Sequence, residues 1–215
     1  MANKSTWTGV KVFMSGAPAA AVPITAISKA TEGVLSVGST TGVSVGSYLL
    51  INSQGMGDLD GRVFRVKALV ANTSITLEAE DTTAYDTFSS GSYQLLTFSN
   101  TISTLTSVSG SGGEFDLIDT TTIHDKQKSN IPGMASALSY SFDSIWDVAD
   151  AGLIAAKAAS QTKAQRAFML QFQNNQRVLF YGYIGTQLQP GGSTGGMVTT
   201  KVTITANGSQ TNYAS

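Results

Sequence analysis

Short runs of β-branched and apolar residues, each closed within a few positions by Gly, Ser or Asn, fill the chain from Lys11 onward. Runs of this length between turn residues are typical of short β-strands. Between about Ile24 and Leu96 they predict six strands, which are enough for a small barrel or sandwich. The predicted strands cover residues 24–27, 33–37, 48–51, 63–66, 74–77 and 93–96.

The pattern changes after Phe98 to longer polar segments. Residues 99–106 predict a polar strand, and the Ser- and Gly-rich residues 107–113 predict a flexible linker. Residues 113–134 form a polar arm, which we expect to be an extended loop or a hairpin. Within this arm, Pro132 and Gly133 predict a type II turn. Apolar and small residues alternate over 135–142, as in a half-buried strand.

One helix is predicted in the chain. It begins near Asp143 or Ser144, a suitable N-cap, and runs to about Ser160 with apolar residues at helical spacing. A hairpin follows, with strands over 168–172 and 178–184 and a turn at Asn174–Asn175. A Gly-rich loop over 191–196 then leads to a last strand over 198–205.

The composition excludes several classes of function. Lysine plus arginine number 13 against 14 aspartates plus glutamates, so no strong overall field attracts nucleic acid or a membrane. The chain has no cysteine, which excludes disulfides, thiolate metal sites and a cysteine nucleophile. No apolar stretch suits a signal peptide or a membrane span, so we expect a soluble protein made in a cytoplasm. Only 13% of residues are charged, which favours a surface that contacts other protein.

Candidate catalytic residues are few. His124 is the only histidine, and its neighbours indicate a solvated charge cluster. Asp58 and Asp60 alternate as calcium ligands do, but no closing glutamate follows at the required spacing, so a solvated turn is the better interpretation. The Gly-rich segments lack the Lys-Ser/Thr ending of a phosphate loop. We expect no enzyme activity, no metal and no cofactor.

The order of elements in the C-terminal half resembles that of phage major tail tube proteins. Its parts are the polar arm, the single helix, the hairpin strands 168–172 and 178–183, a Gly-rich loop and a Thr-alternating final strand. Gly182 matches a glycine within the second hairpin strand of that family. The resemblance covers roughly residues 98–204 and the N-terminal segment.

The first unit resembles a small β-domain of phage structural proteins, which is also likened to the first catalytic-cysteine half-domain of ubiquitin-activating enzymes. Because this chain has no cysteine, none of that enzyme chemistry applies. The resemblance implies a mainly β fold with one helix: a tail-tube β-sandwich or barrel that carries an inserted small β-barrel domain. Residues 1–22 plus 98–215 would form the tail tube domain, and residues 23–97 the insertion, on the outer surface.

The function implied is that of a structural virion protein in the phage tail. It would form hexameric rings stacked into a tube, through which viral DNA passes without specific binding during infection. Its partners would be further copies of itself and tail proteins such as the tape measure, tail tip and terminator, with no membrane, and assembly would occur in the host cytoplasm. A tail terminator or neck protein, an adhesive carbohydrate-binding β module and a small hydrolase remain alternatives.

The arm is the candidate surface for contact between successive rings, because of its length and polarity. The wall of the lumen is expected to be neutral or weakly acidic, so that DNA phosphates do not adhere. The candidate contact residues are Ile131 and Pro132 as anchors and His124, Asp125, Lys126 and Lys128 as a charged rim.

Overall fold

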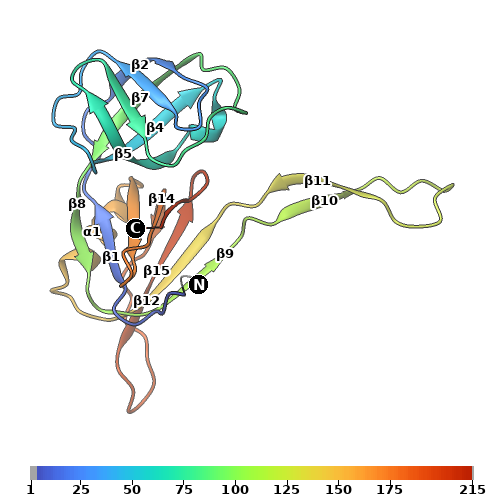
Figure 1. Cartoon of the computed structure of the whole chain (residues 1–215). Coiled ribbons are helices and arrows are strands. Elements are labelled where there is room, and N and C mark those ends of the chain that lie inside the picture. The colour runs from blue at the N-terminus through green and yellow to red at the C-terminus, as the bar shows by residue number, and fades with distance from the viewer. Residues whose placement is uncertain (1–3, 215) are drawn as a thin grey trace.

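A computed structural model describes residues 4–214. Its larger sheet is antiparallel throughout and has the order β8-β1-β13-β14-β15-β12-β9, with β16 beside β14 (Figure 1). The N-terminal strand β1 lies inside this sheet, between β13 and β8. The strands are β1 (Lys11–Ser15), β8 (Phe98–Ile102), β9 (Leu105–Ser111), β12 (Ser139–Ile145), β13 (Gln165–Gln171), β14 (Arg177–Gly185), β15 (Thr199–Ala206) and β16 (Thr211–Tyr213).

The predicted six-stranded unit is a closed barrel of order β2-β3-β6-β5-β4-β7. Closure leaves no free strand edge in this part of the chain. The segment from Gly55 to Arg62 contains a short 3-10 helix, Gly57–Leu59, that buries Leu59 in the barrel core. The barrel strands are β2 (Val22–Ile27), β3 (Val34–Val37), β4 (Tyr48–Gln54), β5 (Arg62–Val70), β6 (Ser74–Leu77) and β7 (Ser90–Leu96).

The helix α1 (Ala151–Gln161) starts later than the sequence pattern predicts. Asp143 and Ser144 lie in β12, where they pair with Lys201 and Thr200 of β15, so the predicted N-cap near residue 143 is wrong. The N-cap is Asp150, whose carboxylate accepts a hydrogen bond from the Leu153 N–H at 2.9 Å. Both positions carry a polar residue before an apolar run, and only the sheet register distinguishes them.

The polar arm is a two-stranded hairpin of β10 (Phe115–Asp119) and β11 (Asn130–Ala135), which extends away from the rest of the molecule (Figure 1). The predicted turn at Pro132–Gly133 is wrong, because both residues lie in β11 and Pro132 faces Leu117 across the hairpin. The predicted linker over 107–113 is also wrong. Most of it belongs to β9, which pairs with β12 along its length, and its serines resemble a linker only in composition.

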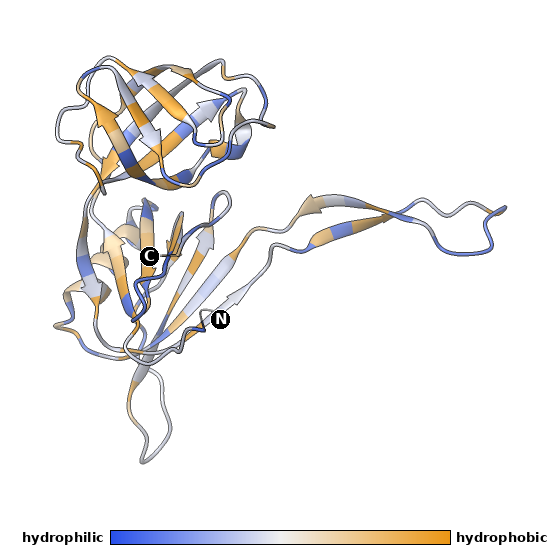
Figure 2. Cartoon of the chain, in the orientation of Figure 1, coloured by the Kyte–Doolittle hydropathy of each residue, from blue (hydrophilic) through white to orange (hydrophobic). Residues whose placement is uncertain are grey.

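The larger sheet is folded around one apolar core. Phe168 and Phe180 of β13 and β14 face Phe142 and Tyr140 of β12, with the Tyr140 and Phe180 rings stacked 4.1 Å apart. Leu153, Ala156 and Ala159 of α1 pack into the same core. The barrel has its own core, a separate cluster of buried residues. Apolar residues recur along the strands of both parts (Figure 2). Within residues 4–214, no helix has the length and hydropathy that a bilayer crossing requires.

Candidate assembly surfaces

A third apolar cluster joins the barrel to the sheet. Leu50, Val63 and Leu96 of the barrel are buried together with residues on the face of the sheet opposite α1. Strand β13 therefore has apolar residues on both faces: Ala167 and Met169 point to the barrel, and Phe168 and Leu170 to the inner core. The sheet partners in this contact are Ala167, Met169, Leu179 and Tyr213.

Polar contacts at the same junction involve Tyr213 of β16, whose side chain is 5% exposed. Its hydroxyl accepts a hydrogen bond from the Arg65 backbone N–H at 2.8 Å, and the Arg65 guanidinium lies 4.8 Å from the ring centroid. Arg65 also pairs with Glu78. Burial raises the pKa of Tyr213, so the hydroxyl stays protonated at neutral pH.

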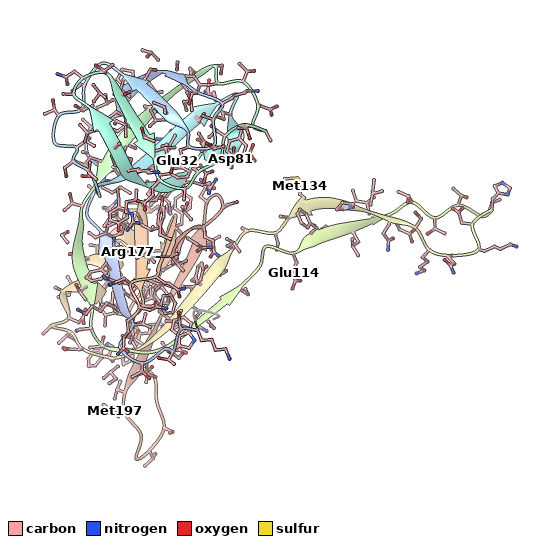
Figure 3. The ribbon with its side chains drawn as sticks, viewed as in Figure 1. Glu32, Asp81, Glu114, Met134, Arg177 and Met197 are labelled. Atoms are coloured by element: carbon pink, nitrogen blue, oxygen red, sulfur yellow. The ribbon has the colours of Figure 1, made fainter. Side chains whose placement is uncertain are left out.

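A second polar bridge connects Arg177 to the Tyr48 hydroxyl of the barrel. Arg177 lies in the part of the sheet beneath the barrel (Figure 3). At the crossover between the two parts, Gly16 N–H bonds to Thr97 O and Ala19 N–H to Leu95 O, each at 3.0 Å. The segments that enter and leave the barrel thus run side by side, and the buried contact opposes independent motion of the barrel.

The residues singled out in the arm are all exposed. His124, Asp125, Lys126 and Lys128 lie in the loop between β10 and β11, and Ile131 and Pro132 lie in β11. Asp125 accepts hydrogen bonds from the Thr122 N–H and hydroxyl at 2.8 and 2.9 Å, and these bonds lower the pKa of its carboxyl. The loop is therefore locally ordered around a charged aspartate.

Sequence reasoning named Ile131 and Pro132 as anchors but missed the other exposed apolar residues of the arm. Leu117 is 68% exposed, Ile131 50% and Met134 85%, with Phe115 and Ile118 similarly open to solvent. Leu117 lies opposite Pro132, and Ile118 opposite Ile131, so apolar side chains occupy both faces of the hairpin. Glu114 and Met134 lie on the stretch where the arm leaves the sheet (Figure 3). The alternation of Phe115, Asp116 and Leu117 was the sequence signal that could have predicted a strand with an apolar face here.

An isolated two-stranded hairpin is marginally stable in water, and exposed apolar clusters of this kind mark surfaces that contact another protein. The two edge strands of the sheet add to this picture. Each of β8 and β9 has a strand neighbour on one side only within residues 4–214. Their unpaired backbone groups can accept a strand from another chain.

The acidic residues of the described part of the chain do not gather into a metal site. Residues 4–214 contain no group of three His, Cys, Asp or Glu side chains placed to hold a metal ion. Asp60 accepts a hydrogen bond from the Ser53 N–H at 2.9 Å, as a turn residue does. A groove of about 260 Å³ beside β9 is lined by Trp7, Val10, Val12 and residues 105–108, none of which titrates.

Comparison with known proteins addresses the identity of the chain. No curated protein matches it. Two solved structures are similar: the tail of an empty gene transfer agent particle, refined with C6 symmetry (TM-score 0.43), and the virion of the native particle (0.41). Both are 17% identical and cover 54% of this chain, and the match covers 86% and 88% of those chains. At such values the likeness carries no argument of its own.

The family is decided by a sequence match. Residues 54–215, most of the chain, match the sequence model of a family described as "Phage tail tube protein, TTP". The predicted fold class, mainly β with one helix, is confirmed by the sheet and the barrel described above. This family is structural, which agrees with the prediction that the chain is not an enzyme. The chain therefore belongs to the phage tail tube protein family and is a structural component of the virion tail.

Proposed function

We propose that this chain assembles into hexameric rings that stack into the tail tube through which viral DNA passes. The single observation that carries the proposal, beyond the family, is the arm: a hairpin with apolar residues exposed on both faces and no covering element among residues 4–214. Such a segment gains stability when a second copy buries it.

Ring closure would use the edges of the sheet. A head-to-tail contact between β9 of one subunit and β8 of the next satisfies the open backbone groups of both strands. Because this contact joins two different surfaces, it generates a closed ring when the rotation between subunits is one sixth of a turn. Edge pairing of this kind needs few charged residues, in agreement with the low charge content of the chain.

Contact between successive rings would use the arm. Ile131 and Pro132 would anchor it, and His124, Asp125, Lys126 and Lys128 would form the charged rim, in agreement with their exposure. Leu117 and Met134, on the same hairpin, extend the apolar anchor. The arm would then be buried on both faces only after stacking.

The domain organisation follows from the same arrangement. Residues 1–22 with 98–215 would form the tube wall, and residues 23–97 an inserted domain on the outside. Support comes from the closed barrel with its two adjacent crossover segments. A barrel of this size inside the bore would obstruct the DNA. The tape measure, tail tip and terminator proteins would be further partners at the ends and inside the tube.

Deletion of the arm tests the proposal. Gly112 and Ala137 lie next to each other across the base of the arm, so a two-glycine link can replace residues 113–136. Because β10 and β11 pair only with each other, the variant should fold as a monomer that keeps the cooperative unfolding transition of the parent, with only the strand signal of the deleted hairpin lost from its circular dichroism. It should form no tubes by electron microscopy, and normal tubes from it would contradict the role of the arm.

Substitutions can distinguish a specific role of the apolar residues of the arm from a general effect of lowering surface hydrophobicity. The pair Leu117→Ser and Ile131→Ser should abolish stacking and leave rings intact. The matched control is Val70→Ser, which removes an apolar side chain of similar exposure from the barrel and should leave tubes unchanged. A tail terminator or neck protein, the alternative function, would give single rings from the parent chain itself.

A further inference from the structure

One face of the sheet carries an array of small hydroxyl side chains. Three rows cross β9, β12 and β15 at matched registers, and every position in them is Ser or Thr except for Asp143 and its cross-strand neighbour Lys201. We call this array the hydroxyl face. Its rows are Ser111–Ser139–Thr205, Ser109–Ser141–Thr203 and Ser107–Asp143–Lys201.

The hydroxyl face is the back of strands whose front is buried. Side chains alternate along a strand, and Phe142, Val202 and Ile204, the residues between these positions, lie in the inner core. Ser109 and Thr205 are exposed, and Ser141 and Thr203 are half-buried between them. The alternation fixes the pattern, because a shift of one residue would bring the hydroxyls into the core.

On strands β1, β13 and β14, the face of the sheet that points away from the inner core is apolar. Behind β1, β13 and β14 it carries Met169 and Leu179, which the barrel covers. The two halves are folded toward each other around the core, as the stacked rings of Tyr140 and Phe180 show. Their backs therefore point to different sides of the molecule. If the barrel lies outside the tube, the hydroxyl face is the surface available to the lumen.

The chemistry of this face suits a surface past which duplex DNA must move. DNA phosphates bind Lys and Arg with release of counterions, so each exposed cation adds adhesion. Serine and threonine hydroxyls are neutral and short. The one lysine in the rows, Lys201, lies beside Asp143, whose carboxylate accepts a hydrogen bond from the Ser107 hydroxyl at 2.7 Å. The three rows have no net charge and no apolar side chain, and the first row continues on β14 with the exposed Tyr183, opposite Thr205.

We propose that the hydroxyl face of β9, β12 and β15 lines the lumen of the assembled tube and is the surface that duplex DNA passes. This inference rests on the proposed function. It assigns to the lumen wall neutral hydroxyls, with one carboxylate, Asp143, opposite one lysine, Lys201, in each subunit.

The absence of cysteine from the chain allows a direct test. Single variants Thr205→Cys and Ser109→Cys place a thiol on the hydroxyl face, and Ala26→Cys, at an exposed position of barrel strand β2, is the control. Each is treated with a small maleimide and with a maleimide coupled to a globular protein wider than the bore seen by electron microscopy. As monomers, all three should react with both reagents.

In tubes, Ala26→Cys should still react with both reagents, whereas Thr205→Cys and Ser109→Cys should react with the small reagent only. Their reaction with the bulky reagent should slow at least tenfold relative to the monomer. Reaction at the control rate would place the face outside and overturn the proposal. Protection of both thiols from both reagents would place the hydroxyl face in a contact between subunits and would also overturn the proposal. The same conclusion would follow if neither variant formed the tubes that the parent forms. If the parent itself forms no tubes, it is the proposed function that fails.

Discussion

Replacing Tyr213 with Phe tests whether the barrel is fixed to the sheet. The change removes only the hydroxyl that accepts the Arg65 backbone N–H, and the ring remains in place beneath the guanidinium. A hydrogen bond lost at a buried site costs about 1–3 kcal/mol. Since about 1.4 kcal/mol corresponds to a tenfold change in an equilibrium, hydrogen-exchange protection of the Arg65 amide should fall roughly fivefold to a hundredfold.

Two further variants complete the test: a control at an exposed tyrosine, and a more severe substitution at Tyr213. Tyr183→Phe removes a hydroxyl from an exposed tyrosine of the same sheet and should change stability by less than about 0.5 kcal/mol. Tyr213→Ala also removes the buried ring, which costs about 3–5 kcal/mol, and should expose the junction to proteases. Unchanged Arg65 protection in Tyr213→Phe, together with a parent-like urea midpoint in Tyr213→Ala, would refute the account of a fixed barrel.

Three further changes have defined outcomes. Asp150→Ala should lower the free energy of unfolding by about 1–3 kcal/mol in urea titrations, because the helix cap and the bonds from Ser103 are lost. Burial alone would raise the pKa of Asp150, but these hydrogen bonds outweigh it and lower the pKa. The stabilisation by Asp150 is therefore present above about pH 4 and is lost as pH falls through the lowered pKa, and a difference between the parent and Asp150→Ala that does not shrink as the pH is lowered below about 4 would contradict this. Gly182→Ala should destabilise by about 1–3 kcal/mol in the same titrations, because a Cβ there would lie 2.2 Å from the Thr205 carbonyl oxygen. Thr205→Lys should slow DNA ejection from assembled particles in a manner relieved by added salt, whereas Ala26→Lys on the barrel should leave the rate unchanged.

Much of the fold could be predicted from the sequence where one face or the whole of a strand is apolar. The six barrel strands and the 168–184 hairpin have such patterns, because their side chains fill closed cores. Gly182 was identified through the family resemblance, and the structure supplies its physical reason, the close approach of β15.

The polar strands were harder to predict. Strand β9 has the composition of a linker, and it is a strand because β12 pairs with it, which no local pattern shows. Asp143 and Asp150 are equally good helix caps in sequence, and only the tertiary register places the first in a strand. Strand β16 was missed for the same reason, since three residues with one buried tyrosine give no periodicity.

The two candidate surfaces also differ in how far the sequence could predict them. The arm was identified from its length and polarity, with Ile131 named as an anchor. Phe115, Leu117 and Ile118 were overlooked because each has an acidic neighbour in the sequence. The hydroxyl face could not be recognised before the strand registers were known, because its rows combine residues from three separate segments.

Electron microscopy of the purified, concentrated chain at neutral pH tests the central claim most directly. The account predicts straight hollow tubes of uniform width, built from stacked sixfold rings, with the barrels visible as outer projections. Single rings that never stack would contradict the role as a tube subunit and favour a tail terminator. Monomers that form no rings at any concentration would contradict self-assembly itself.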